Sequence, residues 1–163
     1  MAVKILQEAV ERDLKALFQG YILKNSRGME RELQIYQQDL PIRVGYDEEG
    51  TEQDPPEPYI IIQTVGGETP GVDDEERTDM ILLIGVFDED PMRRGYRDVL
   101  RIIHQIQRFF AAHRITGRRY ELQFPLSWAV NQEDQHPYYF GAVSLKFLGT
   151  TIFAEEPNDE EID

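Results

Sequence analysis

The sequence predicts an α+β fold: one domain in which a mostly antiparallel sheet packs against one long amphipathic helix and an N-terminal helix. Residues 80–87 form an apolar run closed by an acidic turn with a proline, which is typical of a strand buried on both faces. Residues 95–113 carry apolar side chains at steps of three and four, which indicates a helix about 28 Å long. The flanking strands, 59–65 and 78–87, are joined without room for a crossover helix, so they are most simply antiparallel.

The remaining elements follow from the same periodicities. Residues 3–18 carry apolar side chains at steps of three or four, which predicts a first amphipathic helix that Gly20 ends. Turn chemistry at residues 25–28 precedes a weak alternation at 32–38, which we interpret as a strand. Further strands are expected at 120–124 and 139–147, long loops at 44–58 and 66–76, and a loop or irregular edge segment at 125–134.

Length and composition favour one soluble domain. A chain of 163 residues buries about 70% of the surface that its unfolded form exposes. We expect the domain to span residues 1–154 and an acidic, disordered tail to follow at 155–163. The absence of cysteine excludes a disulfide framework and a Cys-based zinc or redox site. Charges enter early at the N-terminus and no apolar run approaches about 20 residues, so we expect neither a signal peptide nor a membrane span.

The charge is strongly negative and unevenly spread. A formal net charge of −14 argues against a basic groove that wraps nucleic acid. It is compatible with DNA passing nearby, because an acidic wall repels phosphate. Acidic residues concentrate at 47–57, 73–79 and 155–163, which we interpret mainly as solvated loops and a tail.

The sequence carries no catalytic signature. Its three histidines, His104, His113 and His136, include no pair four residues apart on a helix of the kind that binds metal. No serine lies in a nucleophile elbow, and the glycines at 66–71 lack the Lys-Ser/Thr of a phosphate loop. We therefore expect no enzyme, no cofactor and no metal. A small metal-dependent hydrolase or nuclease that uses carboxylates and His136 remains an alternative.

Basic residues gather on the predicted long helix. Arg97, Arg101, His104 and Arg108 follow spacings of four, three and four, which places them on one helix face beside the apolar stripe. One interpretation is ion pairing with acidic loops of the same chain, which contributes little when exposed. The other is contact with an acidic surface of another copy. The candidate residues for such a subunit interface are Arg93, Arg94, Arg97, Arg101 and Arg108.

Three phrases of the sequence resemble the tail terminator (tail completion) proteins of long-tailed bacteriophages. They are the strand at 58–63 after a proline-rich acidic loop, the strand at 84–87 that leads to the helix start at 95–103, and the segment 136–141 that opens the final strand. The resemblance extends over nearly the whole chain, from Leu6 to Leu148.

This resemblance implies a small α+β domain that assembles into a ring, usually of six copies. Such a ring caps the head-proximal end of the tail tube, ends its growth and forms the surface that the head joins. The implied partners are further copies of the chain, the tail tube protein and the head connector or neck proteins. DNA passes through the lumen without specific binding, and the protein resides in the virion after assembly in the host cytoplasm. Another head–tail connector or neck protein is the alternative.

Overall fold

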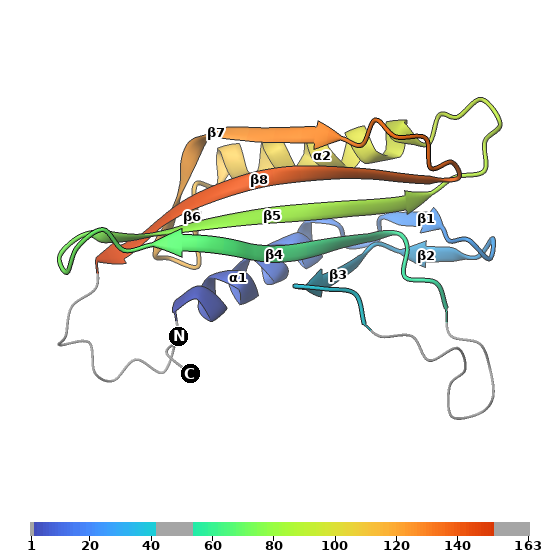
Figure 1. Cartoon of the computed structure of the whole chain (residues 1–163). Coiled ribbons are helices and arrows are strands. Elements are labelled where there is room, and N and C mark those ends of the chain that lie inside the picture. Colours follow the sequence, from blue (N-terminus) through green and yellow to red (C-terminus); the bar gives the residue numbers. More distant parts are fainter. Residues whose placement is uncertain (1, 42–53, 152–163) are drawn as a thin grey trace.

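A curled six-stranded sheet carries two helices in this computed structural model (Figure 1). The structure describes residues 2–41 and 54–151, so the expected acidic tail at 155–163 lies outside the described residues. The α+β class and the mostly antiparallel sheet are confirmed. In chain order the elements are α1 (Ala2–Leu17), β1 (Ile22–Lys24), β2 (Glu30–Glu32), β3 (Gln34–Gln37), β4 (Tyr59–Glu68), β5 (Glu75–Phe87), α2 (Tyr96–Ala112), β6 (Ile115–Thr116), β7 (Tyr120–Val130) and β8 (Tyr138–Thr151).

The sheet is built around its two longest strands. Its order is β3-β4-β5-β8-β7-β6, with β5 and β8 in the middle. The pair β3 and β4 runs parallel, whereas every other neighbouring pair in this sheet is antiparallel. The expected antiparallel pairing of 59–65 with 78–87 is therefore confirmed by the register of β4 and β5.

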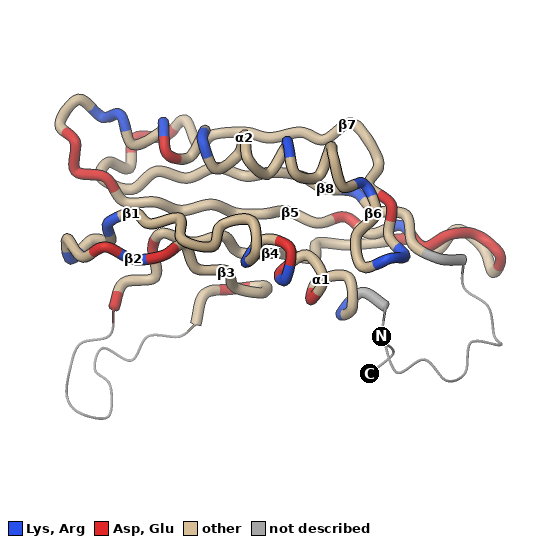
Figure 2. Tube along the Cα trace, turned by 180° about the vertical axis from the view of Figure 1, so that it is seen from behind, with Lys and Arg blue, Asp and Glu red and all other residues tan. Residues whose placement is uncertain are grey.

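Both helices cover the same side of the sheet, as Figures 1 and 2 show from opposite directions. The helix α1 contacts β3 and β4, and α2 contacts β8, β7 and β5. Their apolar stripes and the inward-facing strand residues form one hydrophobic core, because every second strand residue points toward the helices. The core includes Leu6, Val10, Leu14, Ile60, Ile62, Leu82, Ile84, Val99, Ile103, Ile106, Phe110, Val143 and Leu145.

One expectation about β5 is wrong. The apolar run at 80–87 predicted burial on both faces, but only the side chains that face the helices are fully buried. Ile81, Leu83 and Phe87 point to the other face and remain partly exposed. The physical reason is that both helices pack on one side of the sheet. The other face of β5 has no helix over it, although the apolar run predicted that both faces are buried.

A small hairpin after α1 was missed in the sequence. The strands β1 and β2 pair in antiparallel register around the turn that the sequence did predict. The fully buried Asn25 closes that turn, because its Oδ1 accepts hydrogen bonds from the backbone N–H groups of Arg27 at 2.9 Å and Met29 at 3.0 Å. Asparagine is favoured at turns for this ability to bond nearby backbone.

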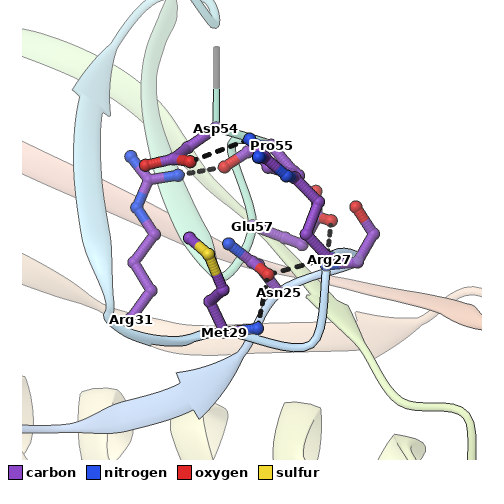
Figure 3. Close-up of polar contacts among 8 residues, drawn as sticks. Asn25, Arg27, Met29, Arg31, Asp54, Pro55 and Glu57 are labelled. Atoms are coloured by element: carbon purple, nitrogen blue, oxygen red, sulfur yellow. Dashed lines mark hydrogen bonds and ion pairs between the residues drawn. The ribbon is translucent and has the colours of Figure 1, made fainter. Parts of the chain in front are cut away.

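The same hairpin anchors the segment that leads into β4 (Figure 3). The expected long loop at 44–58 falls partly on undescribed residues, but residues 54–58 are held by several contacts. The most buried of these contacts joins the carboxylate of Glu57, which is 5% exposed, to the backbone N–H of Ser26 at 2.9 Å. Further contacts are the ion pair between Arg27 and Asp54 at 3.1 Å and the hydrogen bond that Arg31 donates to the carbonyl of Pro55.

Several strands are longer than predicted. The strand β4 continues to Glu68 and β5 begins at Glu75, so the expected loop at 66–76 is largely the end of a β-hairpin. A register shift between Thr64 and Gly66 lets the two strands keep pairing. A Cβ at Gly67 would lie 2.6 Å from the carbonyl oxygen of Arg77, so only glycine allows this close approach. The strand β7 likewise continues through the expected loop at 125–134 as far as Val130.

Candidate functional site

Helix α2 presents its basic residues to solvent. Arg97, Arg101, His104 and Arg108 are all exposed, while most of the apolar residues between them are buried, namely Val99, Ile102, Ile103 and Ile106. The 3.6-residue helical period separates the two sets, because residues three or four apart share a face. The sequence-based placement of these four residues on one exposed helix face is therefore confirmed.

A shallow groove of about 500 Å³ runs along this face of α2 beside the end of α1. The apolar side chains that line it are Leu17 from α1 and Phe109 from α2, which are both partly buried. Arg101, His104 and Arg108 provide its basic lining. We call this surface the basic groove, defined by Leu17, Arg101, His104, Gln105, Arg108 and Phe109.

The aromatic ring in the groove is held in place by its neighbours. Phe109 stacks on His113, with ring centroids 4.4 Å apart and planes 19° apart. The Nδ1 atom of His113 also lies 3.0 Å from the carbonyl oxygen of Phe109. These contacts fix an apolar surface between cationic side chains, an arrangement that suits a ligand with both an apolar and an acidic part.

Three of the five candidate arginines pair with acids of their own chain. Arg101 binds Asp98 at 2.9 Å, one helical turn away. Burial raises the pKa of Asp98, and the positive charge of Arg101 opposes this shift. Arg93 and Arg94, which precede α2, pair with Asp134 and Asp90 at 2.6 Å each. Their charges are thus partly satisfied within the chain, and they do not line the basic groove.

The other two candidates remain available. Neither Arg97 nor Arg108 forms an ion pair with any residue in the ranges 2–41 and 54–151. The structure therefore supports the intrachain interpretation for Arg93, Arg94 and Arg101 and leaves Arg97 and Arg108 as exposed cations. Exposed pairs such as the one of Arg101 contribute little and can exchange partners at little cost.

The acidic counterpart is the end of the β4–β5 hairpin, at one end of the molecule (Figure 2). We call residues 68–76 the acidic tip. It carries five carboxylates and makes no ion pair within the described part of the chain. Val72 projects from it with 82% of its surface exposed. The acids are Glu68, Asp73, Asp74, Glu75 and Glu76.

A second cavity, of about 530 Å³, lies between the start of α2 and the β7–β8 connection. Tyr96, Trp128 and Tyr138 line it and are each more than a third exposed. His136 also lines it, and its Nδ1 lies 2.6 Å from the hydroxyl oxygen of Tyr139. The hydrogen-bond partner of this ring nitrogen is therefore the phenol of Tyr139. No group of three or more His, Asp or Glu residues in the described ranges could hold a metal ion.

We compared the chain with models of protein families and with curated proteins. Neither the models of protein families nor the curated proteins give a match to this chain. None of the helices in the described part of the chain is long and apolar enough to span a membrane.

Sequence reasoning found the basic residues of the groove but missed its apolar lining. Phe109 lies within the apolar periodicity of 95–113, which predicts the core-facing side of the helix, whereas it is only partly buried and reaches the groove. Leu17 lies within the periodicity of 3–18, and its place beside α2 depends on tertiary packing. The exposed Val72 carried one available signal, since an isolated apolar residue within an acidic turn has no core to enter.

Proposed function

We propose that this chain is a structural virion protein of the tail terminator type. Its copies assemble into a ring at the head-proximal end of a phage tail tube, stop the growth of the tube and offer the surface to which the head is joined. The resemblance of the sequence to tail terminator proteins supports this function, and the α+β fold is the fold that the resemblance implies.

The observation that carries the proposal is the separation of charge within one chain. A basic face on α2 and an acidic tip on the β4–β5 hairpin occupy different parts of the surface (Figure 2). Contact between unlike surfaces of identical copies is heterologous, and it produces a ring when the rotation between neighbours closes. The same charge match would also steer copies toward one another in solution.

The negative charge of the chain suits a passage for DNA. Each copy carries a formal net charge of −14, and a ring multiplies that charge around its lumen. Phosphates are repelled by such a surface, so duplex DNA would slide past it without binding. Another connector of the neck would share this property, and the contact with the tail tube separates the two functions.

The test combines assembly with capping. Light scattering and negative-stain electron microscopy should show a closed ring with the mass of several chains, and six is the expected number. Added to polymerising tail tube protein of the cognate phage, the ring should bind one end of each tube and stop its elongation. A ring that binds the portal or connector but leaves elongation unchanged would identify a neck protein instead. A monomer at every concentration would refute the ring.

A further inference from the structure

The basic groove and the acidic tip match in both polarity and charge. The groove combines an apolar surface from Leu17 and Phe109 with the cations of α2. The tip combines the exposed Val72 with five flanking carboxylates. We propose that the acidic tip of one copy docks into the basic groove of the next copy, and this inference rests on the proposed ring function.

The chemistry of the contact follows from the side chains. Val72 would leave water and pack on Leu17 and Phe109, since an apolar residue that is 82% exposed gains most from burial. The carboxylates would form charge-assisted hydrogen bonds with Arg101 and Arg108. Those two arginines lie seven residues apart, which is about 10 Å along a helix. Four of the five acids of the tip are consecutive, from Asp73 in the turn to Glu76 in β5, so two of them can approach the two arginines together.

The occupant is a second copy because the tip is held away from the groove of its own chain. Backbone pairing extends almost to the tip, with Gly67 opposite Thr78 and Glu68 opposite Arg77. These pairs hold the arms of the hairpin in the sheet, so folding the arms back toward α2 would break them. In agreement, no carboxylate of the tip bonds to α2 within the described ranges. The tip is thus an acidic group without a partner, and the groove is its complement.

Reciprocal charge reversal tests the inference. The tip-reversed variant carries Asp73→Lys and Asp74→Lys, and the groove-reversed variant carries Arg101→Glu and Arg108→Glu. In either variant alone, the tip and the groove carry charges of the same sign and repel each other. The affinity of self-association should therefore fall at least a hundredfold at low salt. Mixed in equal amounts, the two variants should reassemble, because each reversed tip meets a reversed groove and each native tip meets a native groove. The alternating ring that results contains an even number of copies.

A matched control separates this contact from a general effect of charge. The variant Arg12→Glu with Arg118→Glu changes the net charge as the groove-reversed variant does, at exposed cations outside the groove. It should assemble as the parent chain does. Circular dichroism of all variants confirms that the fold is intact, and light scattering measures the assembly.

The apolar part of the contact is tested by comparing alanine substitutions at two exposed valines, Val72 in the tip and Val65 before it. Val72→Ala should weaken self-association by about tenfold, as expected for losing most of one buried valine side chain. The control is Val65→Ala, since Val65 is also exposed, at 51%, but precedes the tip. Equal effects of the two substitutions would contradict the seating of Val72 in the groove.

The outcomes distinguish this inference from the proposed function. If the parent forms a ring and the reversed variants assemble as well as it does, or if their mixture stays dissociated, the docking of the tip is wrong while the ring stands. If the parent itself stays monomeric, both the ring and the docking are wrong. The docking is supported only if each reversed variant fails to assemble by itself and the mixture of the two reassembles.

Discussion

The two sides of helix α2 differ in what they determine. One side places Ile102, Ile103, Ile106 and Phe110 in the core at 0–1% exposure. The other side, one or two residues away along the chain, exposes Arg97, Arg101, His104 and Arg108. The buried side fixes the fold, because its contacts are with the sheet of the same chain. The exposed side contributes little to folding and is available for association. We therefore expect substitutions on the two sides of α2 to act differently, one set on stability and the other on the proposed association.

The largest effect is expected on the buried side. Ile106→Asp would place an unpaired charge among β-strand and helix side chains at a site with 0% exposure. The cost is comparable to the whole stability of a domain, about 5–15 kcal/mol, so the variant should not fold to a soluble form. His104→Asp, on the exposed side of the same helix, is the control and should fold normally. A soluble Ile106→Asp variant with a cooperative thermal transition would sink the assignment of the buried stripe.

The next effect is expected on the exposed side, in association rather than stability. Arg97→Glu with Arg101→Glu should weaken self-association while the thermal midpoint of the monomer changes little. The loss should be largest at low salt, because screening at about 0.1 M already reduces interactions between exposed charges beyond about 10 Å. Sedimentation at several salt concentrations measures it. Arg97→Lys with Arg101→Lys keeps the charge and serves as control, and assembly of the Glu variant equal to the parent at low salt would rule out the charge match.

A smaller effect is expected at the acidic tip. An exposed hairpin end is open to proteases, and a Glu-specific endoproteinase should cut the free chain near residues 68–76. Assembly should slow that cleavage several-fold, because docking covers the tip. Peptide mapping before and after assembly measures the ratio, with cleavage after Glu30 of β2 as the internal reference. Unchanged cleavage of the tip in assembled rings would leave it as a solvated turn.

No effect at all is expected in assays of chemistry. We expect the protein not to hydrolyse nucleic acid, peptide or nucleotide with or without divalent metal, since the sequence carries no catalytic signature and no group of three or more His, Asp or Glu in residues 2–41 and 54–151 could hold a metal ion. It should also fail to retain duplex DNA at physiological salt, because of its negative charge. Turnover that disappears in His136→Ala would instead favour the hydrolase alternative.

Periodicity predicted the parts of the fold that depend on local pattern. The segment 95–113 was expected as a helix, and α2 occupies Tyr96–Ala112. The first helix, expected over 3–18, ends at Leu17, and Gly20, the expected stop, lies in the turn that follows with a φ of 77°, a value that favours glycine. Both observations depend on residues that are neighbours in the chain, and such information is present in the sequence itself.

The elements that sequence missed depend on partners far along the chain. Glycine and acidic residues indicated a loop at 66–76. Strands β4 and β5 nevertheless extend into this range, because β4 pairs with β5 and β5 pairs with β8. The hairpin of β1 and β2 is too short to show an alternation, and the buried Asn25 and Glu57 help to hold it. The groove likewise joins Leu17 to a helix about ninety residues later, so no local pattern could reveal it. Arg93, Arg94 and Arg97 were candidates although they lie outside the groove, because the sequence shows which residues share a helix face but not where a groove on that face begins and ends.

The close backbone approach at Gly67 has a consequence for affinity. Because β4 and β5 stay paired as far as Glu68 and Arg77, the arms that carry the tip are already ordered, and docking would not have to fix their backbone torsions. A disordered acidic loop of equal charge would lose far more conformational entropy on binding. If the tip docks as proposed, its affinity should depend on backbone geometry as well as on charge: a substitution that loosens the hairpin at Gly67 should weaken the contact without altering Val72 or any carboxylate of the tip.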